Sequence, residues 1–127
     1  RQIAERMLAK ARTESLLSQA EVVNGITTLA ARVPSSRLEI LREMSDHLRE
    51  QMKSGIIVLG SVYEDKPIFL AAVTQDLVTR GYDAGKIVKE VAKVAGGDGG
   101  GKASLAQAGG KYKDKTDEAL SLVKDLI

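Results

Sequence analysis

Cysteine is absent from this chain of 127 residues, and histidine occurs once, at His47. Without cysteine the chain has no disulfide bond and no thiolate ligand for a metal ion, and one histidine does not make a zinc site alone. The same two facts argue against catalytic sets of the Ser-His-Asp or Cys-His kind, which need a histidine and a nucleophile side by side. His47 lies in the densest polar group of a predicted helix, at spacings that point mostly to solvent; its neighbours are Glu39, Glu43, Asp46 and Glu50. We therefore expect no catalytic site and no metal site here.

Aromatic side chains are scarce, at 3% of the residues, and tryptophan is missing. The four aromatic residues are Phe69, Tyr63, Tyr82 and Tyr112. A core built from this sequence must be aliphatic. Little is left for the aromatic platforms on which single-stranded nucleic acids stack their bases.

Long apolar runs are missing as well, since none reaches the roughly 18 residues that a membrane-spanning helix needs. No signal peptide is visible. The sequence starts with polar residues inside a helical pattern and without an initiator methionine. We therefore expect a piece of a longer cytoplasmic protein with no membrane partner.

Positive charge has only a small overall excess, with a formal net charge of +2, but it gathers in one region. From Lys86 to Lys115 there are seven lysines against three acidic residues. The first three lysines are spaced three and four residues apart, so on a helix they form one exposed stripe. Such a local excess favours a polyanionic partner.

Hydrophobic periodicity predicts an α/β fold, a small mixed sheet packed with helices, preceded by a helical arm. The arm covers residues 1–20 and the globular domain covers residues 21–127. We expect the arm to pack on a second copy or an upstream domain; packing on its own domain is the alternative. The patterns predict strands over about 26–33, 56–63, 68–73 and 103–108, helices over about 36–53, 76–80 and 84–95, and a last helix opened by Asp114 or Thr116.

Two helix starts carry capping signals. Ser36 and Glu39 have the spacing of a capping box, in which each side chain bonds the backbone amide of the other residue. Asp83 precedes the helix over 84–95 and is expected to cap it.

A glycine-rich loop is predicted over residues 96–101, where only Asp98 is not glycine. A Walker-type loop needs Ser or Thr after Lys102, where the chain has Ala103, and it follows a strand rather than a helix. A dinucleotide-binding loop also follows a strand. A structural turn is the third alternative, although a tight corner needs only one or two glycines. We favour a loop whose bare amides hold the backbone of a nucleic acid.

Lysines around this loop complete the predicted site. Phosphate contacts position a nucleic acid without reading its sequence, so the site is expected to recognise shape. The candidate residues are Lys86, Lys89, Lys93, Gly97, Gly99, Gly100, Gly101, Lys102, Lys111 and Lys113, with Lys115 nearby.

The same half of the chain resembles a known domain family. The run Val73-Thr74-Gln75-Asp76-Leu77-Val78, the segment Val88-Lys89-Glu90-Val91-Ala92 and the glycine loop resemble the DHH-associated domain, which closes alanyl-tRNA synthetases and DHH phosphoesterases. The stretch Ala106-Gln107-Ala108-Gly109-Gly110 and the segment Lys115-Thr116-Asp117-Glu118-Ala119-Leu120 resemble the synthetase branch. The resemblance covers about residues 56–127. Asp98 and Lys102 depart from it, because the family often has glycine and arginine there.

The resemblance implies a non-catalytic C-terminal domain of alanyl-tRNA synthetase. Such a domain is expected to bind tRNA-Ala at its outer corner and to help the upstream aminoacylation and editing domains share one tRNA. A homodimer is possible. Zinc and ATP are expected only in the upstream domains, so this fragment needs no cofactor. The alternatives are the substrate-binding C-terminal domain of a DHH phosphoesterase and a dimerisation module.

Overall fold

The computed structural model describes residues 16–127, so residues 1–15 of the predicted arm lie outside the described part. The last helical turn of the arm, at Leu16 and Leu17, contacts its own domain. Leu16 is buried in the core beside the long helix Leu38–Met52. How the arm as a whole packs stays a prediction.

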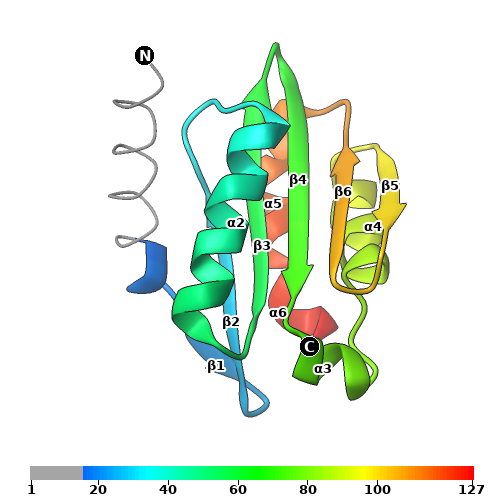
Figure 1. The fold of residues 1–127 in the computed structure, drawn as a ribbon. Coiled ribbons are helices and arrows are strands. Elements are labelled where there is room, and N and C mark those ends of the chain that lie inside the picture. The colour runs from blue at the N-terminus through cyan, green and yellow to red at the C-terminus, as the bar shows by residue number, and fades with distance from the viewer. Residues whose placement is uncertain (1–15) are drawn as a thin grey trace, which may run out of the picture.

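A six-stranded mixed sheet forms the centre of the molecule (Figure 1). Its strands are β1 (Glu21–Val23), β2 (Ile26–Arg32), β3 (Ile56–Tyr63), β4 (Lys66–Val73), β5 (Asp98–Gly101) and β6 (Leu105–Gly109). They lie in the order β1-β2-β3-β4-β6-β5. Only β2 and β3 are parallel, and all other neighbours are antiparallel. The predicted α/β fold with a small mixed sheet is confirmed.

Helices cover both faces of the sheet. The helices are α2 (Leu38–Met52), α3 (Gln75–Thr79), α4 (Ala84–Val94), α5 (Thr116–Ser121) and α6 (Val123–Leu126), with a short 3-10 turn at Lys113–Lys115. Figure 1 shows α2 on one face and α4, α5 and α6 on the other. The predicted last helix is thus broken into two pieces, and it starts at Thr116 rather than Asp114.

The sheet divides the core into two apolar clusters because successive strand residues point to opposite faces. In β3, Ile56 and Val58 pack on the side of α4, while Ile57 and Leu59 pack on the side of α2. All four are fully buried, as expected for a continuous apolar strand that is covered on both faces. Phe69 is the one aromatic residue in this core, which is otherwise aliphatic in the described part of the chain.

Two hairpins have two-residue turns. Asn24 and Gly25 have φ of 51° and 82° and connect β1 to β2. β1 has three residues and was not predicted, because a strand this short has no periodicity to detect. Glu64 and Asp65, with φ of 51° and 66°, connect β3 to β4. Both turns have the positive φ values that match the twist of a hairpin.

The predicted capping box is wrong. The Ser36 hydroxyl donates to the carbonyl of Pro34 at 2.7 Å, and the Ser36 amide donates to Ser61 Oγ at 3.1 Å. Ser36 is therefore used in a buried turn against β3, and α2 begins at Leu38 with no side-chain cap. The prediction for α4 is confirmed, since the carboxylate of Asp83 accepts the amides of Gly85 at 2.8 Å and Lys86 at 3.3 Å.

A polar clamp joins the start of β3 to the start of α3. The Gly55 amide donates to Thr74 Oγ1 at 3.0 Å. The hydroxyls of Ser54 and Thr74 donate to the carboxylate of Asp76 at 2.5 and 2.6 Å. These hydrogen bonds, with that from Ser54 the strongest, hold the pKa of Asp76 below its ordinary value. The clamp therefore favours the charged form of Asp76.

Candidate nucleic-acid interface

The glycine segment is a strand, which corrects the predicted loop over residues 96–101. Residues 98–101 form β5 and pair with β6 at the edge of the sheet. A Cβ atom on Gly99 would overlap the side chain of Ala108, and one on Gly97 would overlap the Gly109 carbonyl. A Cβ on Gly101 would stand 2.8 Å from the Ala106 Cα. The glycines at 97, 99 and 101 are thus required by the close approach of β5 to β6.

Three of the six amides of this segment, those of Gly96, Gly97 and Gly99, donate to acceptors close by in the chain. The Gly96 amide donates to the Lys93 carbonyl at 3.1 Å and the Gly97 amide to the Ala92 carbonyl at 2.9 Å, which ends α4. The Gly99 amide donates to the carboxylate of Asp98 at 2.8 Å. A ring of bare amides around an anion is therefore a poor description of this segment. Any attraction for phosphate must come mainly from the lysine side chains.

Backbone hydrogen bonds place lysines of the loops at both ends of α4. The Ala84 amide donates to the Ala103 carbonyl at 2.8 Å, so the start of α4 lies beside the β5–β6 turn that carries Lys102. The Lys111 amide donates to the Ala95 carbonyl at 2.8 Å, so Lys111 lies at the end of α4. The exposed Lys86, Lys89 and Lys93 lie along the helix between these ends.

Ion pairs divide the six candidate lysines into two groups. Lys93 bonds Glu90 at 3.0 Å, and Lys113 bonds Asp65 at 2.8 Å. Among residues 16–127 no ion pair is formed by the other four, Lys86, Lys89, Lys102 and Lys111. We call these four the open lysines, because their ammonium groups form no ion pair within residues 16–127.

Lys113, which the sequence predicts as a phosphate contact, lies against the tip of the β3–β4 hairpin. The hydrogen bond and charge of Lys113 lower the pKa of Asp65, and those of Asp65 raise the pKa of Lys113. Both side chains are more than half exposed, so the pair is worth little to stability. Asp65 therefore already offsets part of the positive charge of Lys113.

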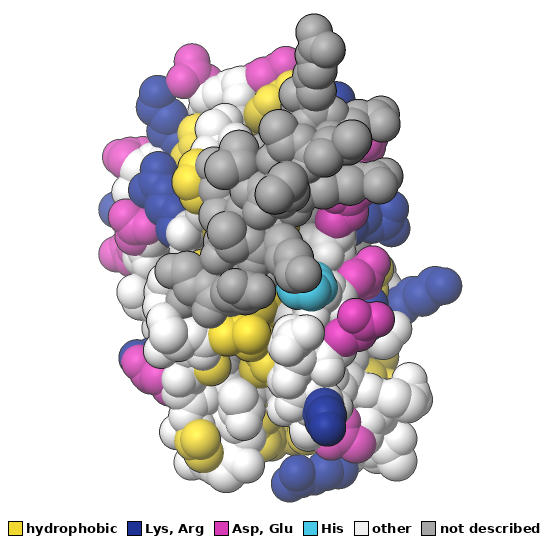
Figure 2. Space-filling view, turned by 60° about the vertical axis from the view of Figure 1, so that its left-hand side comes forward, with side chains coloured by type: hydrophobic (Ala, Val, Ile, Leu, Met, Phe, Trp, Pro, Cys, Tyr) yellow, Lys and Arg dark blue, Asp and Glu magenta, His cyan; other side chains and the backbone are white. Residues whose placement is uncertain are grey.

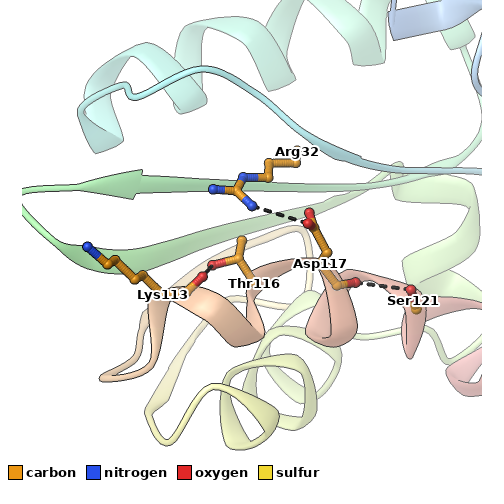
Figure 3. Close-up of polar contacts among 5 residues, drawn as sticks. All are labelled: Arg32, Lys113, Thr116, Asp117 and Ser121. Atoms are coloured by element: carbon orange, nitrogen blue, oxygen red, sulfur yellow. Dashed lines mark hydrogen bonds and ion pairs between the residues drawn. The ribbon is translucent and has the colours of Figure 1, made fainter.

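The opposite edge of the sheet has a hollow of about 630 Å³ between β1, β2 and α5. Two ion pairs line it, Arg32 with Asp117 at 3.2 Å (Figure 3) and Lys124 with Glu21 at 2.8 Å. Acidic and basic side chains are interspersed around hydrophobic ones in the described part of the face seen in Figure 2. The described cations that line this hollow are therefore paired with carboxylates.

The comparisons with known proteins agree with this fold. The DHHA1 domain family matches residues 25–127. The crystal structure of the C-Ala domain from Aquifex aeolicus alanyl-tRNA synthetase superposes with a TM-score of 0.76 at 34% sequence identity, over 84% of this chain and 96% of that one. This chain belongs to the DHHA1 domain family.

Within the family, this DHHA1 domain belongs with alanyl-tRNA synthetases. Alanine–tRNA ligase of Dehalococcoides mccartyi is 50% identical over 123 residues, and that of Bacillus subtilis is 45% identical over 113 residues. These alignments cover 97% and 89% of this chain but only 14% and 13% of the relatives. The chain therefore corresponds to the C-terminal region of such a ligase and spans about one seventh of the length of these relatives.

A more distant likeness shows the fold alone. RecJ from Thermus thermophilus superposes with a TM-score of 0.64, over 98% of this chain and 18% of RecJ, at 10% identity. The described helices of the DHHA1 domain include none that is long and apolar enough to cross a membrane. Residues 16–127 also hold no group of three His, Cys, Asp or Glu side chains that could bind a metal ion.

Sequence reasoning missed Tyr112 as a surface residue. Tyr112 is 55% exposed, whereas Phe69 is fully buried and Tyr63 and Tyr82 are half-buried. The available signal was its position between Lys111 and Lys113, directly after the glycine pair that ends β6. An aromatic residue flanked by lysines is typical of nucleic-acid surfaces.

Proposed function

We propose that this domain binds tRNA-Ala at its outer corner and helps the upstream aminoacylation and editing domains share one tRNA. The observation that supports the proposal is the set of open lysines around α4 and the β5–β6 hairpin. Their ammonium groups form no ion pair within residues 16–127, so they are available to phosphates. The similarity to alanine–tRNA ligases supports tRNA-Ala as the RNA.

Binding of this kind proceeds through the RNA backbone. Each lysine that neutralises a phosphate releases condensed counterions, so affinity arises from charge and falls with salt. Recognition is then a matter of where the phosphates lie in the folded RNA rather than which bases are present. Adenylate formation and editing, with ATP and zinc, are assigned to the upstream domains, which fits a cytoplasmic enzyme of protein synthesis. Self-association through residues 1–20 stays a prediction.

A binding comparison with three nucleic acids tests the proposal. Gel shifts would compare full-length tRNA-Ala, a minihelix of its acceptor stem that lacks the outer corner, and duplex DNA of equal length. We expect tight binding to the full tRNA and clearly weaker binding to the minihelix. Equal affinity for the tRNA and the minihelix would contradict the outer-corner assignment, and equal affinity for duplex DNA would reduce the domain to a general polyanion binder.

A further inference from the structure

Tyr112 is held in place by its backbone while its ring stays accessible. Its amide donates to the Ala95 carbonyl at 2.9 Å, and its carbonyl accepts the Lys115 amide at 3.0 Å. The ring lies against Gly96, the residue that ends α4 with φ of 75°, and a Cβ atom there would stand 2.6 Å from Tyr112 Cδ2. Despite this support, the residue is 55% exposed.

The exposed part of Tyr112 contributes little to the stability of the fold. Burying an aromatic side chain stabilises a protein by roughly 1.5–3 kcal/mol, so a ring left in water forgoes much of that gain. The Tyr112 hydroxyl has no hydrogen-bond partner among the described residues, so the ring is not kept at the surface by a polar contact. A ring with a fixed position and an open side is suited to a flat ligand.

The surroundings of Tyr112 indicate the chemistry of that ligand. Lys111, one of the open lysines, is its neighbour in sequence and donates its amide to the same Ala95 carbonyl. An aromatic ring beside a free cation matches a nucleotide, whose base is flat and whose phosphate is an anion. Val22 is the other large apolar residue exposed in residues 16–127, and it lies on β1 at the far edge of the sheet, away from the open lysines.

We propose that Tyr112 is a stacking platform for an uncovered nucleobase of the bound RNA, with Lys111 neutralising an adjoining phosphate. This rests on the proposed function, because it assigns a base contact to the surface that holds the tRNA. Every base has a π-face, so the contact tolerates any sequence but requires a base that is not covered by a stacked neighbour. It therefore selects loops and corners of an RNA over the interior of a duplex.

Stacking and phosphate contacts differ in their response to salt, which makes the proposal testable. Loss of a phosphate contact lowers the slope of log affinity against log salt by roughly 1, whereas a stacked base releases no condensed counterion. Stacking contributes about 1–3 kcal/mol per base. At about 1.4 kcal/mol per tenfold change in affinity, that corresponds to roughly 5- to 140-fold.

The experiment measures tRNA-Ala binding over a salt series for the 127-residue chain and four variants. Tyr112→Ala should bind roughly 5- to 140-fold more weakly with an unchanged salt slope. Tyr112→Phe should bind like the wild type, because the hydroxyl has no role. Tyr112→Leu, which keeps apolar bulk on Gly96, should lose affinity nearly as Tyr112→Ala does. Val22→Ala is the matched control for loss of an exposed apolar side chain and should bind normally.

Three outcomes overturn the stacking proposal. If the wild type binds tRNA and Tyr112→Ala binds equally well, no base stacks there. If Tyr112→Phe is weakened as much as Tyr112→Ala, the contact is made by the hydroxyl. If Tyr112→Leu retains full affinity while Tyr112→Ala loses it, the ring only supports Gly96. Failure of the wild type to bind any tRNA removes the proposed function, and the stacking proposal with it.

Discussion

The division of the lysines into open and ion-paired groups predicts which charges hold the RNA. Two variants with four Lys→Ala substitutions each test this prediction, and each variant lowers the formal net charge from +2 to −2. The first removes the open lysines, Lys86, Lys89, Lys102 and Lys111. The second removes four lysines that each bond a carboxylate in the structure, Lys93, Lys113, Lys115 and Lys124. Because the charge change is equal, only the position and pairing of the lysines differ.

The expected magnitude follows from counterion release. Each phosphate contact contributes about 0.7–0.9 to the salt slope, so loss of four contacts should lower the slope by roughly 3. From 50 to 200 mM salt, those four contacts account for about a 60-fold loss of affinity in the wild type. The open-lysine variant should show little of that loss, since its affinity is already low at 50 mM.

The assay is fluorescence anisotropy of labelled tRNA-Ala at several salt concentrations, with thermal unfolding to show that both variants are folded. The ion-paired variant should keep most of the wild-type slope. Equal slopes and affinities for the two variants would refute the reasoning, because binding would then follow net charge alone. A larger loss in the ion-paired variant would place the interface elsewhere.

Three further predictions concern the fold that carries this surface. Asp83→Ala should lower the free energy of unfolding by about 1 kcal/mol, because two amides of α4 lose their cap; Asp83→Asn, measured in the same denaturant titration, should lose less. Gly99→Ala should lower it by roughly 1–3 kcal/mol through overlap with β6, whereas Gly100→Ala, whose Cβ would meet nothing within 4 Å, should be tolerated; destabilisation by both would contradict the close-approach argument. The lowered pKa of Asp76 stabilises the fold above the unfolded-state value of about 4, and this stabilisation is lost as the pH falls through the folded-state pKa. Melting curves from pH 6 to pH 2 should therefore show a smaller acid destabilisation for Asp76→Asn than for the wild type, and identical acid profiles would count against the clamp.

The sequence predicted those elements whose signal is local. The apolar stripe of α2, the cap of α4 and the continuous apolar run of β3 are all contained in a few neighbouring residues. Ser36 shows the limit of such signals, since its capping spacing is correct but Ser61, distant in the chain, takes its amide. β5 shows another limit, because glycine has low strand propensity and this strand is formed by its pairing with β6.

The clustering of lysines in sequence predicted a basic surface, and the structure places these lysines around α4 and the β5–β6 hairpin. Which of them form ion pairs was not predictable. The pairing of Lys113 with Asp65, however, joins residues 48 positions apart, which no local pattern reveals. The exposure of Tyr112 depends equally on tertiary structure, because it follows from how the end of β6 meets the end of α4.

Attachment of α4 to the β5–β6 hairpin at both ends gives the surface a fixed length. The helix has 11 residues, which span about 16 Å at 1.5 Å per residue. Lys102 lies beside one end and Lys111 beside the other, so their separation is set by the helix rather than by a hinge. Under the proposed function, Lys102 and Lys111 would contact phosphates that lie a fixed distance apart. An RNA whose backbone turns away within that length would engage one end only, so the domain would discriminate among RNAs by the spacing of their phosphates.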